Sequence, residues 1–269
     1  MNAFRFRLLL LLLGCGFRGL ALCDSLRISA LLAVSDGNGC IYVVSRENIL
    51  SKIDTTLSEV STVNLAPYGF ASSLECRGSN EVIVYCYGTG RLVVFDNFLK
   101  EKNQFDLSTL LRTKPNLVCI SSYGWWCFDE TNSSLSKYNG NFSLLYTYPR
   151  LLGALSGAMK MAEADEKFLV FERSDHTLTP LPVADDAVTV LPEGVENRTS
   201  PALNYHNAVY YTLGNDSVQI VQVLSGRILR TAMPPGVEGA QYILKSNGVF
   251  YIIRKNAVFL RHVPFLLAP

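Results

Sequence analysis

Residues with catalytic side chains are not grouped at the spacings that known chemistry uses. The three histidines, His176, His206 and His262, lie far apart in the sequence, with no cysteine or carboxylate at zinc-ligand spacing. A nucleophile elbow needs the order G-x-S-x-G, but between Gly153 and Gly157 the serine stands one position late. The sequence therefore predicts no catalytic, cofactor-binding or metal-binding residue.

Cysteines offer covalent chemistry instead. The five that follow residue 23 are Cys40, Cys76, Cys86, Cys119 and Cys127. Because five is odd, at least one thiol has no partner within the chain. Cys119 and Cys127 lie symmetrically about Tyr123 in a predicted hairpin, so we predict that they face each other and form a disulfide in an oxidising compartment. The alternative is five buried thiols, which β-strands accommodate.

Four sequons are acceptor sites for N-linked glycans. They begin at Asn132, Asn141, Asn197 and Asn215, all in predicted loops. Their placement favours glycosylation in a protein that enters the secretory pathway.

The first 23 residues predict that route. Arg5 and Arg7 precede six consecutive leucines, and Ala21 and Cys23 suit the two small positions of a cleavage site. A bacterial lipobox ending at Cys15 and a mitochondrial presequence are the alternatives, but six leucines are unsuited to an amphipathic import helix. We expect a signal peptide at residues 1–23, a mature chain at 24–269 and a secreted or lumenal product. No later apolar run is long enough for a membrane helix.

The balance of positive and negative side chains indicates whether the protein binds nucleic acid. Lysine and arginine total 24 against 23 acidic residues, and no segment concentrates the positive charge. We therefore expect no nucleic-acid partner.

A repeat with a period of about 42 residues must position all of these groups. Short apolar runs rich in Val, Ile, Tyr and Phe recur at nearly constant spacing along the chain. They begin at Ile41, Ile83, Trp125, Phe168, Val209 and Val249. The pattern predicts an all-β fold, a six-bladed β-propeller of four-stranded antiparallel blades, whose strands are apolar on both sides because each sheet packs between neighbours. For the last blade, residues 25–29 supply the fourth strand, or residues 265–267 do.

One unit resembles a known group of propellers. Residues 35–45, with the sequence Ser-Asp-Gly-Asn-Gly-Cys-Ile-Tyr-Val-Val-Ser, and then residues 50–56 are similar to a blade of the YVTN, NHL and quinoprotein-like group. The resemblance implies a propeller and carries over no functional residue. Signatures of WD40, kelch and sialidase repeats are absent from the sequence.

Some six-bladed propellers hold a catalytic calcium ion in the central channel, which gives the alternative function, a calcium-dependent hydrolase or lactonase. Glu75 is the one clear carboxylate on a predicted inner strand, with Asn204 as its companion, whereas calcium needs about six oxygen ligands. A small-molecule binder at the channel mouth is a further alternative. The ligand count favours a protein without catalytic activity.

We therefore predict an interaction scaffold for a protein partner. The expected contact surface is the ring face formed by the turns between first and second strands and between third and fourth strands. Its candidate partner-binding residues are Tyr123, Trp125, Phe98, Tyr205 and His206. Asn141 lies on this face, and the other three sequons lie on the opposite one. Trp125 and Trp126 have a competing interpretation as core residues, and we expect Tyr123 to be exposed.

Overall fold

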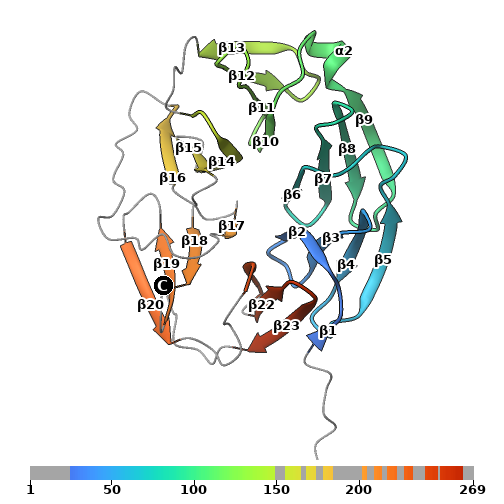
Figure 1. Cartoon of the computed structure of the whole chain (residues 1–269), viewed down its shortest axis with the longest axis vertical. Helices are drawn as coiled ribbons and strands as arrows, with labels where there is room; N and C mark the ends of the chain where they lie inside the picture. The colour runs from blue at the N-terminus through green and yellow to red at the C-terminus, as the bar shows by residue number, and fades with distance from the viewer. Residues whose placement is uncertain are drawn as a thin grey trace, which may run out of the picture.

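Antiparallel sheets stand side by side around a ring (Figure 1). The computed structural model describes residues 25–148, 155–164, 168–173, 178–183, 202–204, 209–213, 217–222, 227–232, 240–247 and 249–262. These residues form five four-stranded sheets and one three-stranded sheet. The chain is an all-β propeller with four-stranded antiparallel blades, of which five are seen where six were predicted.

The first three blades follow one another along the chain. Blade 1 contains β2 (Ala30–Ser35), β3 (Ile41–Ser45), β4 (Ile49–Ile53) and β5 (Glu59–Asn64). Blade 2 contains β6 (Ser73–Arg77), β7 (Glu81–Cys86), β8 (Arg91–Asp96) and β9 (Glu101–Asp106). Blade 3 contains β10 (Leu117–Ser121), β11 (Gly124–Asp129), β12 (Ser134–Asn139) and β13 (Leu144–Tyr148). A short helix, α2 (Leu107–Leu111), joins blades 2 and 3.

The second half of the chain supplies three further sheets. The three-stranded sheet contains β14 (Ala158–Ala164), β15 (Phe168–Arg173) and β16 (Leu178–Pro182). The next blade contains β17 (Ala202–Asn204), β18 (Val209–Leu213), β19 (Ser217–Gln222) and β20 (Arg227–Ala232). The closing blade contains β21 (Tyr242–Ser246), β22 (Val249–Arg254), β23 (Ala257–His262) and β1 (Ser25–Leu26). No helix among these described segments is long and apolar enough to cross a membrane.

Strand β1 closes the ring. It pairs antiparallel with β23, with Ser25 opposite Phe259 and Leu26 opposite Val258. The outer strand of the last blade therefore comes from the start of the described chain. This confirms the predicted closure by residues 25–29. The competing residues 265–267 lie outside the described residues.

The first strand of each sheet lies innermost. Strand β2 lies beside β6, β6 beside β10, and β10 beside β14, while β21 lies beside both β17 and β2 (Figure 1). Apolar clusters fill the spaces between successive sheets, and alternate residues of one strand enter different clusters: Val44 packs between blades 1 and 2, and Val43 between blade 1 and the closing blade. This two-sided burial explains the continuous apolar runs of the sequence.

A repeated turn connects the third and fourth strands of the first three blades. Its first residue, Asp54, Asp96 or Asn139, accepts hydrogen bonds from the backbone amides two and four residues later. The residue three positions later has a positive φ, 59° at Leu57, 62° at Leu99 and 59° at Phe142, and its side chain is buried. The turn thus inserts one apolar side chain while its second and third residues stay at the surface.

The up-and-down order of the strands gives the ring two faces. We call AB face the one with the turns β2–β3, β4–β5, β6–β7, β8–β9, β10–β11 and β12–β13. The BC face carries the turns β3–β4, β7–β8 and β11–β12 and the connections between successive blades. Any candidate site belongs to one face or to the channel between them.

Candidate functional site

Tyr123 is presented on a tight turn of the AB face. Ser121 pairs with Gly124, so the turn between β10 and β11 consists of Ser122 and Tyr123 alone. Gly124 is required there, because a Cβ would lie 2.0 Å from the carbonyl oxygen of Tyr138. Tyr123 itself is 74% exposed, which confirms the predicted exposure.

Glu163 of β14 fixes this turn from the neighbouring sheet. Its Oε2 accepts a hydrogen bond from the backbone amide of Ser122 at 2.9 Å. Its Oε1 accepts from Ser121 Oγ at 3.0 Å and from Trp126 Nε1 at 2.8 Å. Lys137 Nζ lies 3.6 Å from the same Oε1 and 5.0 Å from the centre of the Trp126 ring. This buried carboxylate therefore ties β14 to the first three strands of blade 3.

Arg77 holds the same turn from blade 2. Its Nη2 donates to the carbonyl oxygen of Gly124 at 3.4 Å, and its guanidinium lies 4.8 Å from the centre of the Trp125 ring. Its Nη1 forms an ion pair with Glu81 at 3.2 Å. The turn that carries Tyr123 is thus held from both sides of blade 3.

Phe98 occupies the β8–β9 turn of the same face. Asp96 Oδ1 accepts from the amides of Phe98 at 2.8 Å and Lys100 at 2.9 Å, while Leu99 is directed into the core. Phe98 remains 72% exposed. Lys52 Nζ donates to the carbonyl oxygen of Asn97 at 2.9 Å and lies 5.8 Å from the Phe98 ring centre. A second aromatic ring is therefore presented on an ordered turn.

Trp125 belongs to the core, and its assignment to the partner surface is wrong. It is 2% exposed and stacks on Phe142 with ring centres 5.3 Å apart and planes 5° apart. Trp126 is fully buried on the opposite side of the strand, in the cluster that blade 3 shares with the three-stranded sheet. The two successive tryptophans therefore pack on opposite faces of blade 3, Trp125 toward blade 2 and Trp126 toward the three-stranded sheet. The candidates Tyr205 and His206 lie outside the described residues.

The predicted disulfide is also wrong for this structure. Cys119 pairs with Trp126, whereas Cys127 pairs with Val118, so the two side chains lie on opposite faces of blade 3. The prediction took Tyr123 as the centre of the turn, but a two-residue turn moves the register by one residue, which reverses the face. All five described cysteines are free thiols, and four of them are buried.

Two sequons fall among the described residues. Asn132 is exposed in the β11–β12 turn of the BC face, and Asn141 is exposed in the β12–β13 turn of the AB face. Asn132 Nδ2 donates to Asp129 Oδ2 at 2.7 Å. Burial raises the pKa of Asp129, but hydrogen bonds from Thr113 and Asn132 outweigh it and hold this pKa below its ordinary value. Asn197 and Asn215 lie outside the described residues.

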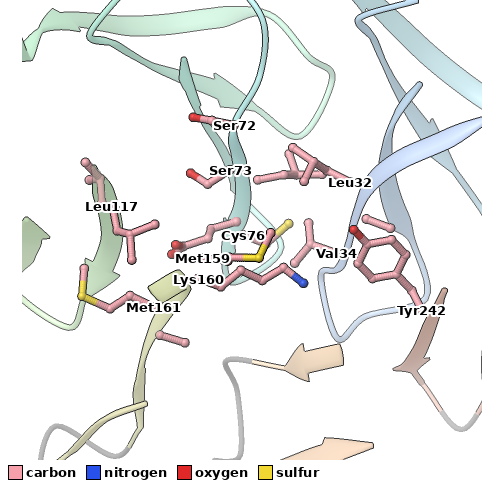
Figure 2. Close-up of a pocket in the computed structure, with 15 residues that line it drawn as sticks. Leu32, Val34, Ser72, Ser73, Cys76, Leu117, Met159, Lys160, Met161 and Tyr242 are labelled. Atoms are coloured by element: carbon pink, nitrogen blue, oxygen red, sulfur yellow. The ribbon is translucent and has the colours of Figure 1, made fainter. Parts of the chain in front are cut away.

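A cavity of about 810 Å³, including its opening to solvent, occupies the channel (Figure 2). Inner strands β2, β6, β10, β14 and β21 line it. Glu75, the predicted inner-strand carboxylate, is among the lining residues, and its Oε2 accepts from the amide of Ile120 at 2.8 Å. The side chain of its proposed companion Asn204 lies outside the described residues. Within the described residues, no three His, Cys, Asp or Glu side chains gather as a metal site requires.

Glu163 is the residue that sequence reasoning missed, since Glu75 was taken as the one clear inner-strand carboxylate. A signal was present, because Glu163 follows Ser121 by one period of the repeat. It therefore occupies an inner strand, although the sequence alone did not show which neighbour it would contact.

Comparison with known proteins shows a fold and no family. No family model matches the chain, and no curated protein matches it. The solved WD40 repeats of RRP9 match with a TM-score of 0.57 and 9% identity, over 88% of this chain and 98% of that chain. The Cps50 (Swd1) β-propeller domain of Myceliophteria thermophila matches with a TM-score of 0.55 and 10% identity, over 89% and 99%. A streptogramin B lyase matches with a TM-score of 0.49 and 11% identity, over 89% and 87%. The first two matches show the β-propeller fold alone.

Proposed function

We propose that this chain is a secreted or lumenal β-propeller that binds a protein partner through its AB face and performs no catalysis itself. It comprises a signal peptide at residues 1–23 and one six-bladed domain at residues 24–269. Five blades, a three-stranded sheet and the regular period of the apolar runs support a ring of six units. The similarity of residues 35–45 and 50–56 to the YVTN, NHL and quinoprotein-like group agrees with a propeller.

The observation that carries the proposal is the rigid presentation of an exposed aromatic ring. Tyr123 is 74% exposed although Glu163 and Arg77 bond to the turn from both sides. A partner that covers Tyr123 gains a large amphipathic contact and loses little backbone entropy, because the turn is already ordered. Phe98, 72% exposed on the same face, extends the surface to blade 2.

Tyr123 and Phe98 are dispensable for the fold on this account, and that property makes them testable. We expect Tyr123→Ala with Phe98→Ala to leave the amount secreted and the melting temperature nearly unchanged, while a partner captured by the wild type is lost. The matched control is Phe70→Ala, since Phe70 is 76% exposed in the β5–β6 connection of the BC face.

Each outcome of this capture experiment decides the proposal. Loss of the partner from the double variant and its retention by Phe70→Ala support binding through the AB face. The reverse pattern, or equal capture by all three proteins, contradicts it. A double variant that is no longer secreted shows that the two rings are structural, which also contradicts the proposal.

Secretion is tested separately through the sequons. Asn132 and Asn141 are exposed on turns, where N-linked glycans are commonly attached. We expect each substitution to glutamine to remove one glycosidase-sensitive step in the mobility of the secreted protein. An unchanged mobility in both variants, or a protein retained in the cytosol, contradicts the proposed route.

A further inference from the structure

The channel cavity has the lining of a small-molecule site. Its wall is largely apolar, and it opens to solvent. The apolar part comprises Leu32, Val34, Leu117, Met159 and Met161, drawn in Figure 2. These residues come from three inner strands, so the site depends on the ring and not on one blade.

The cavity extends toward the BC face. Leu117 and Tyr242 are the first residues of their strands, and Ser72 precedes β6, so the lining lies where the inner strands begin. Met159, at the second position of β14, is 59% exposed. A ligand would reach the cavity from the face opposite to Tyr123.

Most polar groups of the lining already have partners. Ser72 Oγ donates to the carbonyl oxygen of Tyr85 at 2.8 Å, and the Tyr242 hydroxyl donates to that of Leu31 at 2.8 Å. Lys160 points from β14 toward Tyr242, with Nζ 5.2 Å from the ring centre and 3.2 Å from a carboxylate oxygen of Glu172 (Figure 2). These groups shape the wall. The other polar residues of the lining are Ser73, Glu75 and Cys76, of which Glu75 bears the carboxyl group.

Glu75 lines the cavity with one carboxyl oxygen that has no hydrogen-bond partner among the described residues. Burial raises its pKa to about 8, against the effects of the Ile120 amide and Arg77, and Glu163 adds to the rise. At neutral pH the carboxyl group is therefore mainly protonated. Its Oε2 accepts from Ile120, which leaves the other oxygen to carry the proton as a hydrogen-bond donor.

The two cysteine thiols coupled to Glu75 stay neutral between neutral and mildly alkaline pH. Cys76 on the same strand and Cys119 on β10 are coupled to Glu75, but burial raises the pKa of both thiols well above the ordinary value, so they stay neutral. Arg77, which is coupled to Glu75, is paired with Glu81. Lys160 in the cavity wall is paired with Glu172. Glu75 is thus the group whose titration changes the hydrogen bonding of the cavity.

We propose that this cavity binds a small apolar molecule with a carbonyl oxygen, and that the carboxyl group of Glu75 donates a hydrogen bond to that oxygen. The apolar wall supplies affinity by burial, and the Glu75 donor fixes the orientation of the carbonyl group. The inference is independent of partner binding at the AB face, which lies on the opposite side of the ring.

Prodan, a neutral naphthyl ketone whose fluorescence shifts to shorter wavelength in apolar surroundings, is the test ligand. A group with a pKa of about 8 is protonated in about 90% of molecules at pH 7 and about 3% at pH 9.5. If the protonated form alone binds, the apparent Kd for prodan rises about 30-fold between these pH values.

Glu75→Gln is the matched variant. The glutamine carbonyl still accepts from the Ile120 amide, and the side-chain NH2 group still donates, but it does not titrate. We expect this variant to bind prodan at pH 7 and to change its Kd less than about twofold up to pH 9.5. Leu117→Trp fills the cavity, and we expect it to lose prodan binding while its circular dichroism spectrum is kept.

Any one of four results would overturn the proposal. The first three are the absence of a prodan shift with the wild type at pH 7, a wild-type Kd that does not change up to pH 9.5, and the same pH dependence in Glu75→Gln. Undiminished binding by a folded Leu117→Trp variant is a fourth. If Leu117→Trp does not fold, the pH profiles of the wild type and Glu75→Gln decide the question alone.

Discussion

Removing the carboxylate of Glu163 is expected to be among the most destabilising single changes near the Tyr123 turn. In Glu163→Ala, three donors lose their acceptor: Ser121 Oγ, the Ser122 amide and Trp126 Nε1. Ser121 and Trp126 are both 0% exposed, so water does not replace the lost bonds, whereas Ser122 is exposed and recovers one from solvent. Lys137 also loses the carboxylate oxygen 3.6 Å away.

The size of the effect follows from these groups. An unsatisfied buried donor costs about 1–3 kcal/mol, and breaking a buried ion pair by removing one partner costs about 3–5 kcal/mol. Because these costs overlap, we expect Glu163→Ala to lower the free energy of unfolding by about 4 kcal/mol. Glu163→Gln keeps an acceptor but turns an NH2 group toward a donor, so we expect a smaller loss of about 2 kcal/mol.

Urea denaturation followed by tryptophan fluorescence measures both losses, because Trp126 contacts Glu163 directly. The matched control is Tyr123→Ala, which removes a side chain from the same turn without removing a bond described here. We expect it to change the free energy of unfolding by less than about 0.5 kcal/mol. A Glu163→Ala variant within about 1 kcal/mol of the wild type would refute the argument that this carboxylate joins the two sheets.

Three further predictions concern pH, backbone and thiols. The pKa of Glu75 rises from 4.5 to about 8 on folding. The contribution of Glu75 to the free energy of unfolding is therefore complete below pH 4.5 and is lost as the pH rises through 8. We expect the urea midpoint to fall more between pH 5 and pH 9 in the wild type than in Glu75→Gln. Gly90→Ala should lower the free energy of unfolding by about 1–3 kcal/mol, because Gly90 has φ +70° and an added Cβ would lie 2.1 Å from Ser108 Oγ. Gly140→Ala is the control in the same denaturation experiment, because a Cβ at Gly140 meets nothing within 4 Å. A maleimide should label the folded mature protein at Cys40 alone, because this thiol is half-buried and the other four are buried. After denaturation without reductant it should label five thiols. A count of three or fewer would contradict the prediction that all five cysteines are free.

The repeat and the ring closure could be predicted because local patterns carry them. Apolar runs at a fixed spacing define strands that are buried on both sides. Of the predicted closing segment 25–29, Ser25 and Leu26 form the extra strand ahead of the first full blade. Neither inference needs a contact between particular side chains. The β-propeller and its four-stranded blades were recovered for this reason.

Side-chain contacts between sheets could not be predicted from the sequence. The disulfide prediction depended on the register of one hairpin, and a two-residue turn placed Cys119 and Cys127 on opposite faces. Trp125 was assigned to a surface because it follows a turn, but its position on β11 directs it into the core beside Phe142. The role of Glu163 required knowing that β14 lies beside β10. Tyr123 was placed correctly, because the middle of a tight turn is exposed whatever the register.

Site-specific photo-cross-linking detects a partner bound to the AB face in the secreted protein itself. A photoreactive benzoylphenylalanine is introduced in place of Tyr123 or, as the matched control, in place of Phe70, and the secreted proteins are irradiated in the medium or lumen where they reside. Both side chains are about three-quarters exposed, 74% and 76%, but they lie on opposite faces of the ring. We expect a specific cross-linked protein from position 123 and none from position 70. A cross-link from position 70 alone, or from neither position, would contradict partner binding through the AB face.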